Sequence, residues 1–442
     1  MGRLFGTDGV RGRFGRELTT DLANALGRAA VVVLARYQRE PPTFVIGRDT
    51  RASGEPLEAA LVEGIATAGG DAYRMGIQPT PAIAFLTTAL SAGSGVVISA
   101  SHNPPEDNGI KFFGPFGFKL SDELEDEIEA EVAAVGGGTG RAGRVLEAPA
   151  DAPDYVDHVV AAAECDLEGM RIVVDCANGA ASHVAPEVLR RLGAEVYPIF
   201  AEPNGSNINV GCGALHPEIV AGAVVAAGAD AGVAHDGDAD RALFADENGS
   251  VIDGDQVLAA CAISMKEQGR LDGDLVVATV MSNIGLRLAM DKAGIRLLHA
   301  PVGDRYVLEQ MQEHGAVLGG EQSGHVIFRD NATTGDGLIT AVRFLSLSRR
   351  KGVSVAELGS AMRRFPQALV NVEVGRRDGL EGAEDVWSAV RAAEAELGTS
   401  GRVLVRASGT EPLVRVMVEA ESEALARSTA DALATRVRAA LG

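Results

Sequence analysis

The hydrophobic and polar positions repeat one supersecondary unit three times along the chain. Each copy is an apolar strand, a polar loop rich in Gly, Ser and Asn, an amphipathic stretch of helix length, a Gly and a second short strand. The copies span residues 43–73, 171–197 and 274–298. Strand–helix–strand alternation in which a Gly ends each helix predicts parallel or mixed sheets covered by helices. Because successive copies begin more than 100 residues apart, they indicate tandem domains and not a solenoid.

The pattern changes after Phe365. The last part of the chain is predicted to form strands at 368–374, 402–406 and 413–419 and helices at 385–396 and 423–441. These elements predict a smaller α+β domain. We therefore expect an α/β protein of three related domains and this fourth one, arranged around a central cleft. The expected domains are residues 1–150, 151–254, 255–366 and 367–442.

Composition and charge exclude several classes of partner. The 442 residues include 40 Lys and Arg against 61 Asp and Glu, a net charge of −21. A surface this acidic gains no counterion release from nucleic acid and is repelled by anionic lipid. The longest apolar runs have seven residues, whereas a membrane span needs about 20. The four cysteines form no C-x-x-C pair, and the chain opens with no signal-peptide pattern, so we expect a cytoplasmic protein.

The sharpest chemical signal is the segment His235–Arg241, in which Asp236, Asp238 and Asp240 alternate with small residues. Three carboxylates at this spacing can converge on one hard cation. An EF-hand is excluded because its sixth position would be Arg241, where the turn needs Gly, and because strand-like segments flank the loop. With three protein ligands the expected metal is Mg²⁺, which commonly completes its coordination with phosphate or water.

A second motif, Ser99–Pro104, follows an apolar strand and is predicted to present a side chain at the carboxyl edge of a sheet. Lys111 supplies a cation near the same loop. By themselves such Ser, Asn and Pro residues are also typical of an ordinary turn.

Two further motifs suit a phosphorylated sugar. The segment Arg406–Arg415 places a Ser-Gly-Thr turn between two strands and is a candidate phosphate cradle, although an ordinary hairpin turn fits it too. The segment Gly319–His325 combines a carboxylate, an amide, a hydroxyl and an imidazole, which suits sugar hydroxyls. Read alone, His325 fits a structural role better than a catalytic one. No Walker A or dinucleotide-binding fingerprint occurs.

Together these four motifs, in this order and at these separations, resemble the α-D-phosphohexomutase superfamily over essentially the whole chain. Within it the chain is most similar to the bacterial phosphoglucosamine mutases, on the residues Phe5–Gly12, Gln322 and Val302–Val307. The segment Gly213–His216 departs from the family pattern Gly-Ser-Thr-His, because Ala and Leu replace the two hydroxyl residues.

The resemblance implies roles for individual residues. Ser101 is expected to be the phosphoserine, and its phosphate is expected to join Asp236, Asp238 and Asp240 around Mg²⁺. Lys111 is the leading general acid or base, with His102, Arg11 and His325 as further catalytic candidates. The residues expected to bind the substrate are Glu321 and Ser323 at the sugar hydroxyls, Arg406, Ser408, Gly409, Thr410 and Arg415 at the phosphate that is not reacting, and Arg241 as a compensating cation.

The implied activity is an isomerase that interconverts glucosamine 6-phosphate and glucosamine 1-phosphate through a hexosamine 1,6-bisphosphate, feeding UDP-N-acetylglucosamine and cell-wall synthesis. A similar bisphosphate would act as activator, and the family suggests a homodimer. Three alternatives stay open: a phosphomannomutase/phosphoglucomutase, a Mg²⁺-dependent sugar phosphatase, and a phosphosugar-binding sensor without catalysis.

Overall fold

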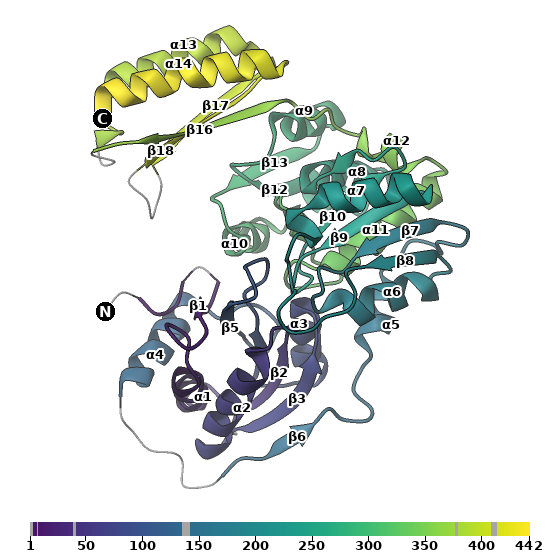
Figure 1. Ribbon diagram of the computed structural model, residues 1–442, viewed down its shortest axis with the longest axis vertical. Coiled ribbons are helices and arrows are strands. Elements are labelled where there is room, and N and C mark those ends of the chain that lie inside the picture. Colours follow the sequence, from purple (N-terminus) through teal and green to yellow (C-terminus); the bar gives the residue numbers. More distant parts are fainter. Residues whose placement is uncertain (1–2, 7, 39–40, 135–141, 376–378, 408–412) are drawn as a thin grey trace. The chain divides into compact units, whose positions relative to one another are not determined.

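The computed structural model describes residues 3–6, 8–38, 41–134, 142–375, 379–407 and 413–442. Its contacts divide the chain into two units. The first unit contains residues 1–281 and 295–361, and the second contains residues 282–294 and 362–442. Figure 1 shows the elements of both units along the chain.

The first sheet of the larger unit is mixed and has the strand order β1-β5-β4-β2-β3-β6. Its central strands β4, β2 and β3 are parallel, and β5 runs antiparallel to both β1 and β4. The strands are β1 Val10–Arg13, β2 Thr43–Arg48, β3 Asp71–Ile77, β4 Ser94–Ile98, β5 Asp107–Phe113 and β6 Val145–Glu147. The helices are α1 Thr20–Leu34, α2 Gly54–Thr67, α3 Thr80–Ala89 and α4 Asp122–Ala133.

Side-chain alternation in β2 explains the two helical layers on this sheet. Phe44 and Ile46 belong to a core shared with α1, α2 and α4, whereas Val45 between them packs with Ile83 of α3. Successive side chains of a strand point to opposite faces, so a central strand that is apolar throughout needs helices on both.

The second sheet has the order β11-β10-β9-β7-β8, with β9, β7 and β8 parallel and β10 antiparallel to β9. The hairpin between β9 and β10 therefore carries residues 236–241. The elements are α5 Tyr155–Ala161, β7 Arg171–Asp175, α6 Ala181–Arg191, β8 Glu195–Ile199, the short 3₁₀ turn Gly213–Leu215, α7 Pro217–Ala227, β9 Ala231–His235, β10 Ala242–Asp246 and β11 Val251–Ile252.

The third sheet has the order β13-β12-β14-β15, with only the last pair antiparallel. The turn between β14 and β15 carries residues 321–325. The elements are α8 Gly254–Glu267, the 3₁₀ turn Asp272–Asp274, β12 Leu275–Thr279, β13 Arg296–Ala300, α10 Asp304–His314, β14 Leu318–Gly320, β15 Val326–Phe328, α11 Gly337–Lys351 and α12 Val355–Gly359.

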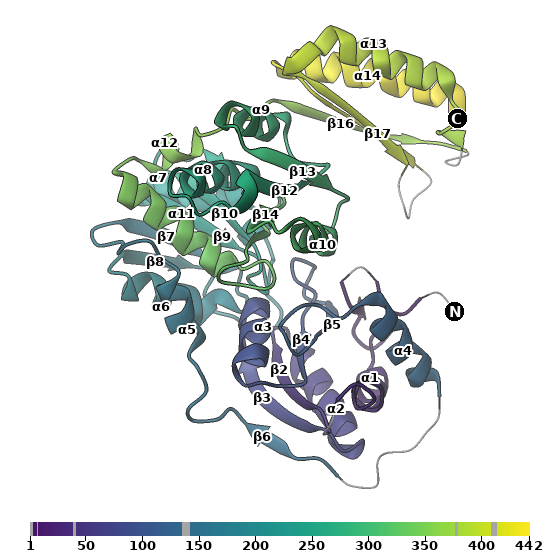
Figure 2. The ribbon, with the colours of Figure 1, turned by 180° about the vertical axis from the view of Figure 1, so that it is seen from behind.

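The second unit has an antiparallel three-stranded sheet, ordered β16-β18-β17, under two helices. Figures 1 and 2 show α13 and α14 side by side on one face of this sheet. The elements are β16 Gln367–Glu373, α13 Glu384–Leu397, the 3₁₀ turn Gly398–Ser400, β17 Arg402–Ala407, β18 Leu413–Glu419 and α14 Glu423–Leu441. The five elements expected here are each within one residue of these bounds.

Helix α9, Ile284–Ala293, belongs to the second unit although it lies between β12 and β13 in the sequence. The buried carboxylate of Glu419 accepts the Ile284 N–H at 2.8 Å, at the helix N-terminus where an anion is favoured. The Asn283 side chain donates to the Phe365 carbonyl and accepts the Phe365 N–H, both at 3.0 Å. These contacts attach residues 282–294 to the C-terminal sheet.

The expectation of an α/β protein with mixed, helix-covered sheets and a smaller C-terminal α+β domain is confirmed. One sheet falls within each of the four expected domain ranges, and the bounds themselves stay a prediction. Among the described residues, no helix is both long enough and apolar enough to cross a membrane.

Two glycines allow α1 and α2 to pack closely. A Cβ on Gly27 would lie 2.4 Å from the Leu61 carbonyl oxygen, and one on Gly64 would lie 2.1 Å from the Asn24 carbonyl oxygen. Backbone atoms cannot yield as a flexible side chain does, so these contacts require glycine.

We expect Gly64→Ala to lower the melting temperature, because overpacking at this helix contact costs about 1–3 kcal/mol. The matched control is Gly222→Ala in α7, where a Cβ meets nothing within 4 Å. At this exposed helical position the same change should raise the free energy of unfolding by about 0.5–1 kcal/mol. Equal melting temperatures of the two variants would contradict the close packing of α1 and α2.

Candidate active site

The β9–β10 hairpin brings three carboxylates together. Asp236, Asp238 and Asp240 are all buried, and one ligand oxygen from each lies within 4.8 Å of the others. Three neighbouring segments hold the hairpin through its carbonyls: the Thr80 N–H donates to Asp238 O, the Ala180 N–H to Gly237 O and the Gly337 N–H to Ala239 O. The carboxylates therefore converge because the backbone that carries them is held from three sides.

The donor set fits a hard cation. Asp238 Oδ1 and Asp240 Oδ1 are buried and have no hydrogen-bond partner within the described part of the chain. Burial, together with the charges of Asp240 and Asp238, raises the pKa of Asp236 well above its usual range. A divalent ion would remove this repulsion, and carboxylate oxygens are the ligands that hard cations prefer.

Ser101 lies beside this group at the end of β4. Its hydroxyl donates to Asp236 Oδ2 at 2.7 Å, although the two residues are 135 positions apart in the sequence. Its φ of +51° is in the left-handed region, which non-glycine residues seldom adopt. His102 Nδ1 lies 3.2 Å from Ser101 Oγ. Burial and the Arg241 and Arg11 charges lower the pKa of His102 to about 4, so its imidazole is neutral at pH 7.

Lys111 on β5 is the cation closest to the carboxylate group. Its Nζ lies 3.1 Å from Asp238 Oδ2 and 2.9 Å from Asp8 Oδ2. Burial alone would lower the pKa of Lys111, but the Asp238 and Asp8 carboxylates outweigh it and raise that pKa. Lys111 is therefore charged in this arrangement.

Asp8 has a larger part in the site than its motif suggested. Besides Lys111, it forms ion pairs with Arg11 and with Lys119 Nζ at 2.7 Å. Burial opposes ionisation, but the three cations hold the pKa of Asp8 well below its usual range. Sequence reasoning cited the segment 5–12 only for its resemblance, and the one available signal for Asp8 was an acidic residue three positions before Arg11.

The β14–β15 turn is tied to the carboxylate hairpin through His325 and Gly324. His325 Nδ1 lies 3.5 Å from Asp240 Oδ2, and a Cβ on Gly324 would lie 2.4 Å from the Ala242 carbonyl oxygen. Although burial lowers it, the charge of Asp240 raises the pKa of His325 to about 9. In the arrangement observed, Nε2 accepts the Gly335 N–H at 3.1 Å, so a proton added there would break that bond.

Glu321 and Gln322 of the same turn contact different neighbours. Glu321 Oε1 accepts the Gly303 N–H at 3.1 Å, and Oε2 accepts the Ser323 hydroxyl at 3.2 Å. Gln322 instead donates to Asp253, the residue that caps α8, at 3.2 Å. Glu321 therefore links the expected sugar-binding turn to the start of α10, while Gln322 fixes the turn to the protein.

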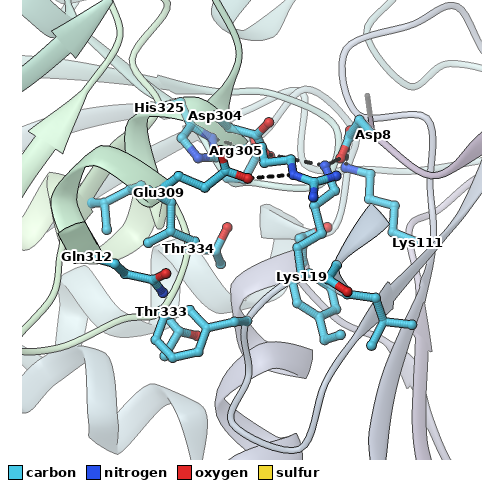
Figure 3. Close-up of a pocket in the computed structure, with 18 residues that line it drawn as sticks. Asp8, Lys111, Lys119, Asp304, Arg305, Glu309, Gln312, His325, Thr333 and Thr334 are labelled. Atoms are coloured by element: carbon cyan, nitrogen blue, oxygen red, sulfur yellow. Dashed lines mark hydrogen bonds and ion pairs between the residues drawn. The ribbon is translucent and has the colours of Figure 1, made fainter. Parts of the chain in front are cut away.

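A cavity of about 180 Å³ opens beside these residues. Figure 3 shows Asp8, Lys111 and Lys119 on one side of it and Asp304, Glu309 and His325 on the other. Its lining includes Asp240, two residues of the segment Val302–Val307 (Asp304 and Arg305), and residues that the sequence did not single out: Lys119, Glu309, Gln312, Thr333 and Thr334.

The four family models for phosphoglucomutase/phosphomannomutase match residues 2–136 (domain I), 153–249 (domain II), 253–365 (domain III) and 369–436 (C-terminal domain). The chain belongs to the phosphoglucomutase/phosphomannomutase family. It is accordingly an isomerase of the mutase type.

Relatives within this family are similar over almost the whole chain. A phosphoglucosamine mutase from Thermobifida fusca is 54% identical and covers 99% of this chain and 98% of the relative. A phosphoglucosamine mutase from Desulforudis audaxviator is also 54% identical, over 96% of this chain and 95% of the relative. Among solved structures, a phosphoglucomutase/phosphomannomutase family protein from Burkholderia thailandensis is 27% identical, with a TM-score of 0.85, over 99% of this chain and 97% of that one.

The expected phosphate-binding residues of this family member lie in the second unit. Arg406 and Arg415 are directly opposite each other in the β17–β18 ladder. Burial and the Arg415 charge lower the pKa of Arg406, which shows two like charges near each other. An anion would stabilise such a pair. Ser408, Gly409 and Thr410 lie outside the described residues.

The remaining expected residues are placed as follows. Arg11 pairs with Asp8, and Arg241 Nε lies 3.8 Å from Asp240 Oδ1. The larger unit thus brings together candidates from the regions of its three sheets: Ser101, His102, Lys111, Arg11, Asp236, Asp238, Asp240, Arg241, Glu321, Ser323 and His325.

We expect divalent cations to raise the melting temperature of this mutase by neutralising the three carboxylates. A ligand that binds only the folded protein raises the free energy of unfolding by about 2.7 kcal/mol when its concentration is a hundredfold above Kd. Asp238→Asn should lose most of the shift, whereas Asp272→Asn, a change of an exposed carboxylate, should retain it. A shift of wild-type size in Asp238→Asn would contradict the assignment.

Proposed function

We propose that this chain interconverts glucosamine 6-phosphate and glucosamine 1-phosphate, with Ser101 as the group that donates and recovers the phosphoryl. The observation that carries the proposal is the 2.7 Å hydrogen bond from Ser101 Oγ to Asp236, which places a hydroxyl nucleophile at a buried three-carboxylate site. The phosphoglucosamine mutases that are 52–54% identical over nearly the whole chain support the same substrate.

Mg²⁺ is the cation proposed for Asp236, Asp238 and Asp240, with an oxygen of phosphorylated Ser101 as a further ligand. When bound, it supplies Lewis-acid polarisation of the phosphoryl group. The Thr80 hydroxyl and Lys111 both contact Asp238 Oδ2, at 2.7 and 3.1 Å, so Oδ1, which has no hydrogen-bond partner among the described residues, would be the oxygen that holds the cation.

The protein's own groups account for the proton transfers. In the return step the bond between phosphorus and the sugar oxygen breaks, and a bond to Ser101 Oγ forms. The neutral imidazole of His102, whose Nδ1 already contacts Oγ, accepts the hydroxyl proton, while Asp236 orients the hydroxyl. Charged Lys111 donates a proton to the departing sugar oxygen. The first step is the reverse of this sequence, with a 1,6-bisphosphate between the two.

Two arginines serve the phosphate that is not reacting. Arg406 and Arg415 face the same side of the β17–β18 ladder, and their fixed forks suit phosphate oxygens. Phosphoryl transfer depends on alignment and on charge stabilisation of the equatorial oxygens.

The cavity favours an amino sugar over a neutral hexose. An ammonium group needs an anionic acceptor, and three of the four carboxylates that line the cavity already have close cationic partners or belong to the metal group. Asp8 faces three cations, Glu309 accepts from Arg305 at 2.9 Å, and Asp240 pairs with His325. Asp304 has a more distant partner, Lys119 at 3.7 Å. It directly follows Gly303, whose N–H donates to Glu321 of the expected sugar-binding turn. Because Asp304 therefore lies next to that turn, we assign the substrate amine to Asp304.

We expect Ser101→Ala to abolish conversion, because no hydroxyl remains to carry the phosphoryl group. Wild-type protein should convert glucosamine 6-phosphate with a kcat/KM above those for glucose and mannose 6-phosphates, and without release of inorganic phosphate. A preference for mannose or glucose would identify a phosphomannomutase/phosphoglucomutase. Phosphate released in step with substrate loss would identify a phosphatase, and tight binding without turnover would identify a sensor.

Asp304→Asn should reduce kcat/KM for glucosamine 6-phosphate by about tenfold or more, because a hydrogen bond to a charged group contributes roughly 1.5–3 kcal/mol. Its kcat/KM for glucose 6-phosphate should stay within a few-fold of wild type. Glu309→Gln, a change in the same cavity, should leave the ratio of the two substrates unchanged. A uniform loss on both substrates in Asp304→Asn would exclude amine recognition by Asp304.

A further inference from the structure

The backbone of Ser101 is held at both of its polar atoms. Its N–H donates to the Ser99 hydroxyl at 2.9 Å, and that hydroxyl donates to Asp49 Oδ2 at 2.6 Å. Its carbonyl accepts from Arg51 Nη2 at 2.9 Å. Because its φ of +51° is unfavourable for a residue with a side chain, this conformation needs such support.

Arg51 binds three carbonyls of the serine loop. Nη2 also donates to Asn103 O at 2.8 Å, and Nη1 donates to Pro104 O. The guanidinium is itself fixed by Asp49, since Nε lies 2.9 Å from Oδ2 and both side chains are fully buried. Asp49 therefore supports Ser101 on both sides. It fixes Arg51, which donates to the Ser101 carbonyl, and it accepts from the Ser99 hydroxyl, which in turn accepts the Ser101 N–H.

Asn209 reaches the same loop from the second sheet's domain. Its Nδ2 donates to Ser101 O at 2.9 Å and to Asn103 O at 3.0 Å, so two carbonyls each receive bonds from both Arg51 and Asn209. The Asn209 N–H donates to Ala177 O at 2.9 Å, which attaches the residue to the segment after β7.

Asn209 also lies against the carboxylate hairpin. A Cβ on Gly237, the residue between Asp236 and Asp238, would lie 2.6 Å from Ser101 O and 2.9 Å from Asn209 Nδ2. The amide of Asn209 thus lies at the junction between the serine loop and the hairpin.

We propose that Asn209 and Arg51 are positioning residues for phosphoryl transfer: through the Ser101 and Asn103 carbonyls they hold Ser101 Oγ against Asp236 across the contact between two domains. They act on the carbonyl side of the loop and not on the reacting atoms. The inference rests on the proposed function, because positioning matters only if Ser101 carries the phosphoryl group.

Substitutions at position 209 can remove the amide without straining the backbone. The φ of Asn209 is +60°, which glycine adopts freely, so Asn209→Gly deletes the two bonds and keeps the backbone conformation. Asn209→Asp keeps the shape but turns carboxylate oxygens toward two carbonyls. Asn207→Gly is the matched control, because the Asn207 side chain binds Glu202 O and the Asn204 N–H within its own loop.

Single-turnover transfer from phosphorylated enzyme to glucosamine 6-phosphate tests the role. Asn209→Gly and Asn209→Asp should lower the transfer rate and kcat by about 10- to 100-fold, as misalignment of reacting groups does, with KM within about twofold. Arg51→Lys, which retains the charge opposite Asp49, should likewise lower the transfer rate and kcat while KM stays within about twofold of wild type. Asn207→Gly should match wild type.

Amide hydrogen exchange supplies a readout that does not depend on turnover. Exchange at residues 101–107 should rise in Asn209→Gly and stay at the wild-type level in Asn207→Gly. Unchanged exchange, a wild-type transfer rate in Asn209→Gly, a loss confined to KM, or an equal loss in Asn207→Gly would overturn the inference. Failure of the proposed function is distinct: wild-type protein would then not interconvert the sugar phosphates, or Ser101→Ala would remain active.

Discussion

The mutual repulsion of three buried carboxylates is the constraint on which this site depends. Asp236, Asp238 and Asp240 are withdrawn from water onto one short hairpin, where burial and the charges of Asp240 and Asp238 raise the pKa of Asp236. Lys111 offsets part of that charge, and Asp8 in turn holds Lys111 together with two other cations. A divalent ion would compensate the remaining negative charge, so the electrostatics of the fold as well as the ligand spacing fit a metal site.

Alternating charge extends outward from this centre. From the hairpin toward the cavity lined by α10, Asp238 contacts Lys111, Lys111 contacts Asp8, and Asp8 contacts Lys119. Such an arrangement lets a strongly acidic protein present local positive charge to a phosphate without a general basic surface. It also explains why the net charge of −21 and a phosphorylated substrate are compatible.

Much of this architecture could be predicted from local pattern. The strands and helices of the C-terminal domain were within one residue because their periodicity and turn residues agree, and the Asp triad was recognisable because its ligands are adjacent in sequence. Asn209 was not found, and Asp8 and Asp304 were cited only as parts of the segments Phe5–Gly12 and Val302–Val307, without a role in the site. Each is a single polar residue whose meaning depends on contacts with segments far away in the sequence, such as Lys111, Lys119 and Ser101. Sequence spacing carries no information about such pairs.

The assignment of α9 to the C-terminal unit has a topological consequence. The polypeptide passes between the two units three times, after residues 281, 294 and 361. The C-terminal unit is therefore discontinuous in sequence. A fragment that begins at β16 would lack α9, and the N-terminus of α9 would lose the Glu419 carboxylate that accepts the Ile284 N–H. During synthesis, α9 emerges well over 100 residues before that glutamate, so its docking must wait until the last strand of the protein has been made.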